Sequence, residues 1–560
     1  MVGVTAHAPR RTPSRTAGLV FAWTVAAVLV LAVLATAWVG VRGALAYGHL
    51  RDAQARVSAA TAALDDPAAA ASALGEVAVD TSAARSLTGD PIWAAASALP
   101  WVGPQLAAVS QVAAAIDDVA ADALGAAAQS LATAAVDLDG IDDAPLLGVV
   151  RTAVGQAREL VAEAAGSADA LHRATQLVPA VLGLDGPRSY LVVFQNNAEW
   201  RSMGGIVGAV AQISTDGGRL SLTAQGSSGD FRSSQDDPVV ALPDEILDIF
   251  DTRPARFIQN VTQLPDFTLG APIAREMWLR ERGTAVDGVV ALDPVSLSYI
   301  LRATGPVTLP TGDQLTSDNA VSLLLDEVYR RYEEPAAQDA FFQSAAAAVF
   351  QALADGRADP GALVDALTEA GEQRRLLVWS TDAAEQAILD GTTLQGALPV
   401  TDAERTEFGV YLNDGTGSKM DYHLGVDVET AWCGADSASV RVTLRNDAPD
   451  PSTLPDYVTG GGAFGVPVGE ALTGVYVYLP EGATLADQRL VSDGSAPSTV
   501  TGTDRGRSVV KWSVQLAPGQ RANLDLRVDT PVTPVLDALV TPTVNAIDTH
   551  RVGVTCGFPE

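Results

Sequence analysis

The chain has 560 residues, and its 36 Lys and Arg against 67 Asp and Glu give a formal net charge of −31. At roughly 150 residues per domain, this length indicates about three or four structural units. Hydrophobic residues make up 48% of the chain, which excludes wholesale disorder. An acidic body repels phosphate polyanions, so we expect no nucleic-acid partner.

The first feature along the chain is the uncharged stretch 17–41, which follows a short N-terminus, 1–16. About 20 apolar residues span a bilayer as a helix, so we predict a single transmembrane helix with a cytoplasmic N-terminus. A cleaved signal peptide is the alternative, because Ala35-Thr36-Ala37 fits a small-x-small cleavage site, although the apolar run is longer than a usual signal core. Both alternatives export the bulk of the chain. The uncleaved helix, which the length of the run favours, predicts a single-pass cell-membrane protein with an extracytoplasmic body.

Residues 43–183 are rich in Ala, with apolar side chains at intervals of three and four residues and breakers such as Asp66-Pro67 between the runs. This pattern predicts a helical stalk. Because Ala side chains permit close helix approach, we expect a hairpin or small bundle rather than one long rod.

Strand and helix patterns alternate over 186–420, which predicts an α/β domain. Tyr190–Phe194 and Asp287–Leu292 have the composition of strands, and Arg275–Arg282 has a helical pattern. Asp293 followed by Pro294 has the form of a helix start.

From 421 to 560 the helical patterns disappear and short alternating runs predict a β-sandwich. Both cysteines of the chain, Cys433 and Cys556, lie there. In an exported protein they could form a disulfide that closes a loop of ~120 residues; two unpaired buried thiols are the alternative. The predicted fold class is therefore multidomain α+β: an N-terminal transmembrane helix, a helical stalk or bundle, a central α/β domain and a C-terminal β-sandwich.

Common catalytic motifs are absent from the sequence. The five His are scattered and no Cys-x-x-Cys occurs, which argues against a zinc site. Gly415–Met420 lacks the spacing of a phosphate loop, and no Gly-x-Ser-x-Gly is present. No catalytic residue can be assigned from these patterns.

A polar segment follows the first strand of the α/β region, where open α/β sheets bind ligands. Paired glycines let a backbone approach closely and expose N–H groups to an anion, and Arg201 could bind a phosphate or carboxylate in bidentate fashion. The ligand-binding candidates in this segment are Asn196, Asn197, Glu199, Arg201, Gly204 and Gly205. The alternative is a polar turn in which the Asn side chains cap backbone groups and Arg201 pairs with Glu199.

The run Tyr190-Leu-Val-Val-Phe-Gln-Asn-Asn-Ala-Glu-Trp-Arg-Ser-Met-Gly-Gly205 resembles the signature of bacterial envelope proteins grouped as domain-of-unknown-function family 4012. Further blocks resemble the family in the same order: Asn260–Phe267, Val286–Pro294, Thr304–Leu309 and Tyr411–Lys419. They add Asn260, Asp266 and Lys419 to the ligand-binding candidates. For Lys419, a solvated loop position is the alternative.

A more distant resemblance is to the LytR-CpsA-Psr phosphotransferases, which attach polyprenyl-pyrophosphate-linked glycans to the wall. Asp287–Asp293 and Ile300–Val307 are similar to blocks of that family, and Arg201 loosely matches an arginine that binds pyrophosphate there. This chain reads Gln225–Phe231 where those enzymes carry Ser-x-Pro-Arg-Asp, and Arg232 is the nearest substitute. Since phosphoryl transfer needs cationic groups around the transition state, the departure weakens transferase activity more than ligand binding.

Three acids are candidates for a Mg²⁺ site beside a pyrophosphate, because Mg²⁺ prefers carboxylates and phosphate oxygens. They are Asp230, Asp266 and Asp293. Asp293 is equally explained as a helix cap, and Asp266 as a turn residue.

These observations predict a membrane-anchored envelope protein that binds, and in a stronger version transfers, a polyprenyl-pyrophosphate-linked or wall glycan. If it is an enzyme, it would be a glycan phosphotransferase. The alternative is a non-enzymatic envelope scaffold or interaction protein. A polyprenyl-binding protein requires an apolar groove beside Arg201, whereas a scaffold does not.

Overall fold

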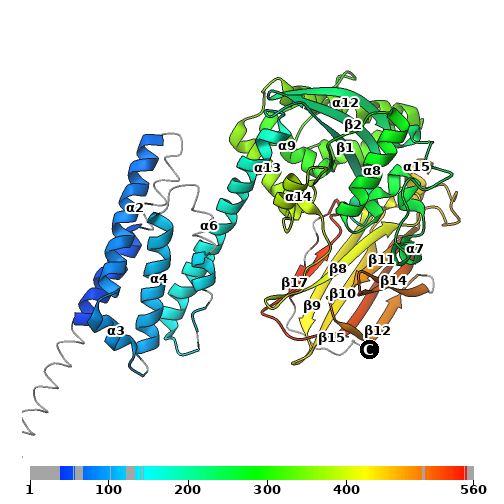
Figure 1. The fold of residues 1–560 in the computed structure, drawn as a ribbon. Helices are drawn as coiled ribbons and strands as arrows, with labels where there is room; N and C mark the ends of the chain where they lie inside the picture. Colours follow the sequence, from blue (N-terminus) through cyan, green and yellow to red (C-terminus); the bar gives the residue numbers. More distant parts are fainter. Residues whose placement is uncertain are drawn as a thin grey trace, which may run out of the picture. The chain divides into compact units, whose positions relative to one another are not determined.

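The structure is a computed structural model, shown in Figure 1. It describes residues 38–53, 56, 67–100, 102–121, 133–138, 140–142, 144–494, 498–545, 547 and 549–551. The chain divides into two compact units, Met1–Thr175 and Gln176–Glu560.

The first unit is a bundle of Ala-rich helices. Its helices are 38–53, α2 (Pro67–Thr88), α3 (Pro91–Ser97), α4 (Gly103–Ala121), 133–138 and α6 (Gly148–Val181), whose last turns belong to the second unit. Ala46, Ala84 and Ala113 meet in one apolar cluster, and none of them is exposed. Because each contributes a single methyl group, the three helices that carry them can pack closely. A second cluster around Leu138 and Val154 joins α4, helix 133–138 and α6.

The predicted fold class needs one correction, at the N-terminus. Among the residues that the structure describes, no helix combines the length and the apolar character needed to cross a membrane. The described end of the predicted span, 38–41, continues into a helix that carries Arg42, Arg51 and Asp52. Residues 17–37 lie outside the described part of the chain.

A mixed five-stranded sheet forms the α/β part of the second unit, in the order β3-β2-β1-β4-β7. Its strands are β1 (Arg188–Arg201), β2 (Gly204–Asp216), β3 (Arg219–Ser227), β4 (Gly288–Leu292) and β7 (Leu377–Ser380). β1 and β4 are parallel, and Phe194, in the middle of β1, lies beside Leu292, the last residue of β4. The other neighbours are antiparallel.

Helices cover both faces of this sheet. The longer ones are α8 (Phe267–Arg282), α9 (Pro294–Thr304), α12 (Pro335–Ala354) and α13 (Pro360–Glu372). Successive residues of a strand point to opposite faces. Leu191 and Val193 of β1 share a buried cluster with Trp278 of α8. Phe194, at the alternate position, lines a hollow together with Phe342 of α12.

Two five-stranded sheets form the β-sandwich, in the orders β12-β15-β10-β9-β17 and β13-β14-β11-β8-β16. Alternate residues of β10, among them Val440 and Val442, are buried in a cluster that also contains Val475 of β11 and Trp512 of β14 from the other sheet. The strands are β8 (Arg405–Asp414), β9 (Leu424–Trp432), β10 (Ser437–Asn446), β11 (Ala471–Tyr478), β12 (Thr484–Ser492), β13 (Ser498–Asp504), β14 (Arg507–Leu516), β15 (Arg521–Asp529), β16 (Val535–Val540) and β17 (Thr549–Arg551).

The predicted boundary at 420 falls inside a continuous structure. β8 lies before it in sequence, yet pairs with β11 and β16 in the sandwich.

The remaining elements of the second unit are η1 (Ser228–Asp230), α7 (Asp244–Phe250), η2 (Arg253–Ala255), η3 (Ile258–Gln263), β5 (Val307–Thr308), β6 (Gln314–Leu315), α10 (Ala320–Ser322), η4 (Leu323–Glu327), α11 (Val328–Arg331), α14 (Ala383–Leu389), η5 (Thr393–Gln395), η6 (Met420–His423), η7 (Pro451–Thr453) and α15 (Asp456–Thr459).

Candidate functional site

The polar segment predicted from sequence forms the last part of β1 and its turn into β2. Asn196 pairs with Ile206 and Trp200 pairs with Gly205, so the residues between Asn196 and Trp200 bulge out of the pairing. A Cβ atom on Gly205 would lie 2.3 Å from the carbonyl carbon and oxygen of Asn196. Glycine is therefore required at 205, and the bulge carries Glu199 away from the sheet.

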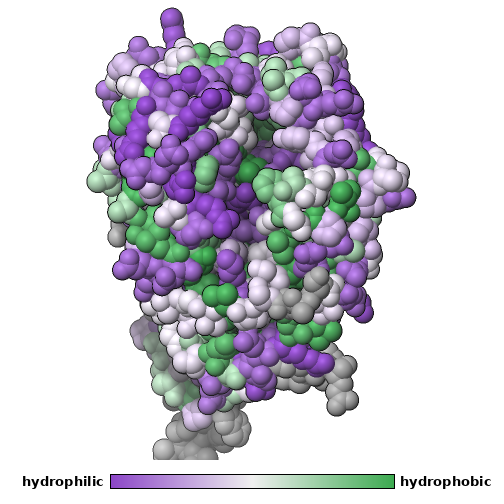
Figure 2. All heavy atoms as spheres, turned by 90° about the vertical axis from the view of Figure 1, so that its right-hand side faces the viewer, coloured by the Kyte–Doolittle hydropathy of each residue, from purple (hydrophilic) through white to green (hydrophobic). Residues whose placement is uncertain are grey.

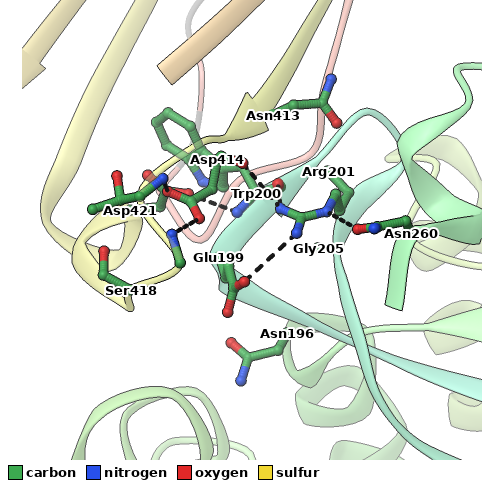
Figure 3. Close-up of polar contacts among 12 residues, drawn as sticks. Asn196, Glu199, Trp200, Arg201, Gly205, Asn260, Asn413, Asp414, Ser418 and Asp421 are labelled. Carbon is green, nitrogen blue, oxygen red and sulfur yellow. Dashed lines mark hydrogen bonds and ion pairs between the residues drawn. The ribbon is translucent and has the colours of Figure 1, made fainter. Parts of the chain in front are cut away.

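Glu199 joins a buried charge cluster, which we define as Glu199, Arg201, Asp414, Lys419 and Asp421. Figure 3 shows four of these residues, Glu199, Arg201, Asp414 and Asp421. The Lys419 ammonium pairs with Glu199 Oε2, and Arg201 Nη2 lies 3.6 Å from Glu199 Oε1. The backbone N–H of Trp200 donates to Asp421 Oδ2 at 2.6 Å. The cluster thus connects the end of β1 to the segment between β8 and β9 of the sandwich.

The Arg201 guanidinium is bonded to neighbouring protein groups on several sides. Its Nε donates to Asn260 Oδ1 at 3.0 Å, and its Nη1 donates to the carbonyl of Trp200 at 2.7 Å. Its side chain is only 10% exposed. These contacts favour the interpretation in which Arg201 pairs with Glu199 over one in which it is free to bind a phosphate.

The cluster sets three carboxylates against two cations, so full ionisation would leave a buried excess of negative charge. Burial raises the pKa of Asp421 well above its ordinary value, and the neighbouring Asp414 raises it further. Burial, followed by Glu199, also raises the pKa of Asp414. Although burial alone would lower it, the carboxylate of Glu199 raises the pKa of Lys419, which keeps this side chain charged.

The two asparagines of the segment have different surroundings. Asn197 is fully buried and donates to the carbonyl of Pro542 at 3.1 Å, so it holds the chain beyond β16. Asn196 accepts from the N–H of Ala198 at 3.0 Å and donates to the Tyr329 hydroxyl. Asn196 lines the apolar groove described below.

The three acids proposed for Mg²⁺ are each paired with an arginine. Asp230 pairs with Arg282, Asp266 with Arg505, and Asp293 with Arg375. Asp266 and Asp293 also cap α8 and α9 by accepting backbone N–H groups of those helices. Within the described part of the chain, no three His, Cys, Asp or Glu side chains gather in a way that could hold a metal ion.

An apolar groove lies where the parallel pairing of β1 with β4 ends, at Phe194 in the middle of β1 and Leu292 at the carboxyl end of β4. It has a volume of about 550 Å³ including its open mouth. Apolar residues from strands β1, β2 and β4 and from helices α9, η4 and α12 line it, among them Phe194, Leu292, Leu297, Leu324, Phe342 and Ala346. The polar residues of its wall are Gln195, Asn196 and Asp293.

The groove is beside Asn196 rather than Arg201, because Arg201 is not among the residues that line it. Figure 2 shows one face of the second unit, which is hollowed, with both hydrophobic and hydrophilic residues in the hollow. The sequence pattern did not reveal the lining residues, since they come from five separate segments and each also has the composition of ordinary core. What the sequence did indicate was the general position of a ligand site, just after a buried strand of an α/β region.

Cys433 follows β9 and is disulfide-bonded. Cys556 lies outside the described residues, so its pairing with Cys433 stays a prediction.

Part of the chain matches a known protein family. Residues 185–329 match the family described as "Protein of unknown function (DUF4012)", which confirms the resemblance predicted from the segment around Asn196. The match runs from β1 into the start of α11, and so includes the part of the charge cluster that β1 contributes and the groove residues other than those of α12. No curated protein matches the chain.

Proposed function

We propose that the second unit binds the apolar chain of a lipid-linked ligand in the groove where the parallel pairing of β1 with β4 ends. The observation that carries this proposal is the composition of the groove, which is apolar along its walls and polar only at Gln195, Asn196 and Asp293. Ligand sites of this kind combine apolar walls with a few placed polar groups.

A polyprenyl-linked envelope glycan is the ligand class that we propose for this groove. An isoprenoid chain is apolar and linear, so its burial against Phe194, Leu297 and Phe342 would be favourable at roughly 25 cal/mol per Å² of apolar surface. The resemblance to envelope proteins supports the same class. The glycan and its phosphates would remain outside, at the open mouth of the groove.

Binding is the part of the predicted function that the contacts support. Asp293, the charged residue of the groove wall, is already paired with Arg375, which is itself buried. Arg201 and Lys419 are bonded to Glu199 rather than directed at the groove. We therefore propose a carrier or presenting role, and we assign no transfer step to these residues.

Native mass spectrometry of the full chain tests the proposal. Ala346→Trp would place an indole in the groove, and Ala347→Trp is the matched control, since Ala347 neighbours it in α12 but does not line the groove. We expect a copurified or added polyprenyl phosphate to be retained by the wild type and by Ala347→Trp, and lost in Ala346→Trp.

Equal retention by the two variants would place the lipid elsewhere and contradict the proposal. Failure of the wild type to bind an added polyprenyl phosphate at any concentration tested would favour the scaffold alternative.

A further inference from the structure

One end of the first unit exposes large apolar side chains from separate segments of the chain. We call this set the apolar tip. It consists of Ile92 (43% exposed) in α3, Leu99 (54%) and Val102 (52%) before α4, and Leu147 (66%) and Val149 (85%) at the start of α6. A single exposed apolar residue is ordinary, but several gathered at one end indicate a contact surface.

Hydrogen bonds hold the segments of the tip together. The Gln105 side chain donates to the carbonyl of Pro145 at 2.6 Å and accepts from the N–H of Leu147 at 2.8 Å, which ties the start of α4 to the start of α6. Trp93 Nε1 donates to the carbonyl of Leu106 at 3.1 Å, which ties α3 to α4. Figure 1 shows α3 and the beginnings of α4 and α6 at the same end of this unit.

The first described helix begins at this end too. Arg42 Nε lies 2.9 Å from Asp90 Oδ2, and the Trp38 indole donates to the same oxygen at 3.3 Å. Asp90 is the N-cap of α3, so the start of helix 38–53 lies beside the tip. The residues before it in sequence, 17–37, contain no charged side chain.

We infer that the apolar tip is a surface for contact with a lipid bilayer. Its side chains project from helix ends and turns, as expected for insertion into an interface rather than for packing along a helix side. Of the acids near the tip, Asp90 is neutralised by Arg42, whereas Asp142 is exposed in the turn before Leu147. Trp38, which is 46% exposed, is a residue type favoured at the headgroup level. Residues 17–37, which are uncharged, lead into the same end. This inference concerns the first unit and does not depend on the groove.

Spin labels on the full chain test the inference. A nitroxide is placed at residue 102 or 149 through Val102→Cys or Val149→Cys, and the protein is added to vesicles of phosphatidylethanolamine and phosphatidylglycerol. The control is Val79→Cys: Val79 is 69% exposed on α2. It lies nine residues before the end of α2, which is roughly 13 Å along the axis at 1.5 Å per residue.

The labels at 102 and 149 are expected to be relaxed several-fold more by lipid-soluble oxygen than by an aqueous nickel chelate, and the label at 79 the reverse. Circular dichroism checks that each labelled protein is folded. Equal exposure of all three labels to the nickel chelate would overturn the inference, as would absence of the protein from the vesicles. Protection of 102 and 149 from both reagents would also overturn it, because it would show that protein, such as residues 17–37 or a second copy, covers the tip.

Discussion

At the scale of single residues, mutation of Arg201 distinguishes a ligand-binding role for its side chain from a structural one. If Arg201 bound the ligand, Arg201→Ala would lose the ligand with little loss of stability. The contacts to Glu199, Asn260 and the Trp200 carbonyl favour the structural role. Because removing one partner of a buried ion pair leaves the other uncompensated, we expect Arg201→Ala to lower the free energy of unfolding by about 3–5 kcal/mol.

Urea unfolding of the full chain, followed by the β-sheet signal, measures this loss. Arg232→Ala is the matched control, since Arg232 is exposed and is expected to change stability by no more than about 0.5 kcal/mol. Equal stability of the two variants would return Arg201 to the ligand-binding candidates.

The raised pKa of Asp421 in the folded protein predicts that the stability of the fold depends on pH. Burial and then Asp414 raise its pKa in the folded state, so the folded protein holds this proton more tightly than the unfolded chain does. The stabilisation from this group is complete below the unfolded pKa of about 3.9 and is lost as the pH rises through the folded pKa. Asp421→Asn cannot titrate, so its stability should fall less than that of the wild type above about pH 4.

The measurement is the free energy of unfolding from acid to neutral pH for the wild type, Asp421→Asn and the exposed control Asp236→Asn. A wild-type curve parallel to that of Asp421→Asn would show that Asp421 gives up its proton without cost to the fold.

At the scale of elements, the close approach of β2 to the bulge in β1 predicts different effects for two glycines of one strand. A Cβ on Gly205 would overlap the backbone of Asn196, whereas a Cβ on Gly208 meets nothing within 4 Å. We expect Gly205→Ala to lower the unfolding midpoint, with a loss of about 3 kcal/mol from overpacking. Gly208→Ala should leave stability unchanged or raise it slightly, because Ala loses less backbone entropy in a strand.

Thermal unfolding of both variants decides this prediction. If Gly205→Ala is as stable as Gly208→Ala, the bulge can relax, and the position of Glu199 would not be fixed by the hairpin.

Local signals predicted the elements that depend on neighbours in sequence. The Asp293-Pro294 start was recognised because an N-cap and its helix are adjacent, and α9 begins there. The continuation of β1 to Arg201 was not visible, since the polar residues that end it are satisfied from far along the chain: Glu199 pairs with Lys419, 220 residues away. The same reason hides the groove, whose walls meet only after the sheet and helices have packed.

At the scale of the whole molecule, sequence patterns indicate where strands lie but not the order in which the strands pair in the sheets. The run Phe408–Asn413 has strand composition, but composition does not state which sheet a strand joins. β8 entered the sandwich because its alternate residues, Phe408, Val410 and Leu412, complete the apolar cluster between the two sheets. The boundary predicted at 420, where the helical patterns stop, therefore lies after β8, the first strand of the sandwich in sequence.

The disulfide gives a prediction for the second unit as a whole. Cys433 is disulfide-bonded, and Cys556 is the other cysteine of the sequence. A bond between them would close a loop of ~120 residues and restrict the unfolded chain, which stabilises by about 4–5 kcal/mol in the chain-entropy model. We expect Cys433→Ser and Cys556→Ser to lower the unfolding free energy by the same amount, and the double variant to add nothing further, because either change removes the same bond. Peptide mapping without reductant should recover the two cysteine peptides joined; separate peptides, or additive losses in the double variant, would contradict this pairing.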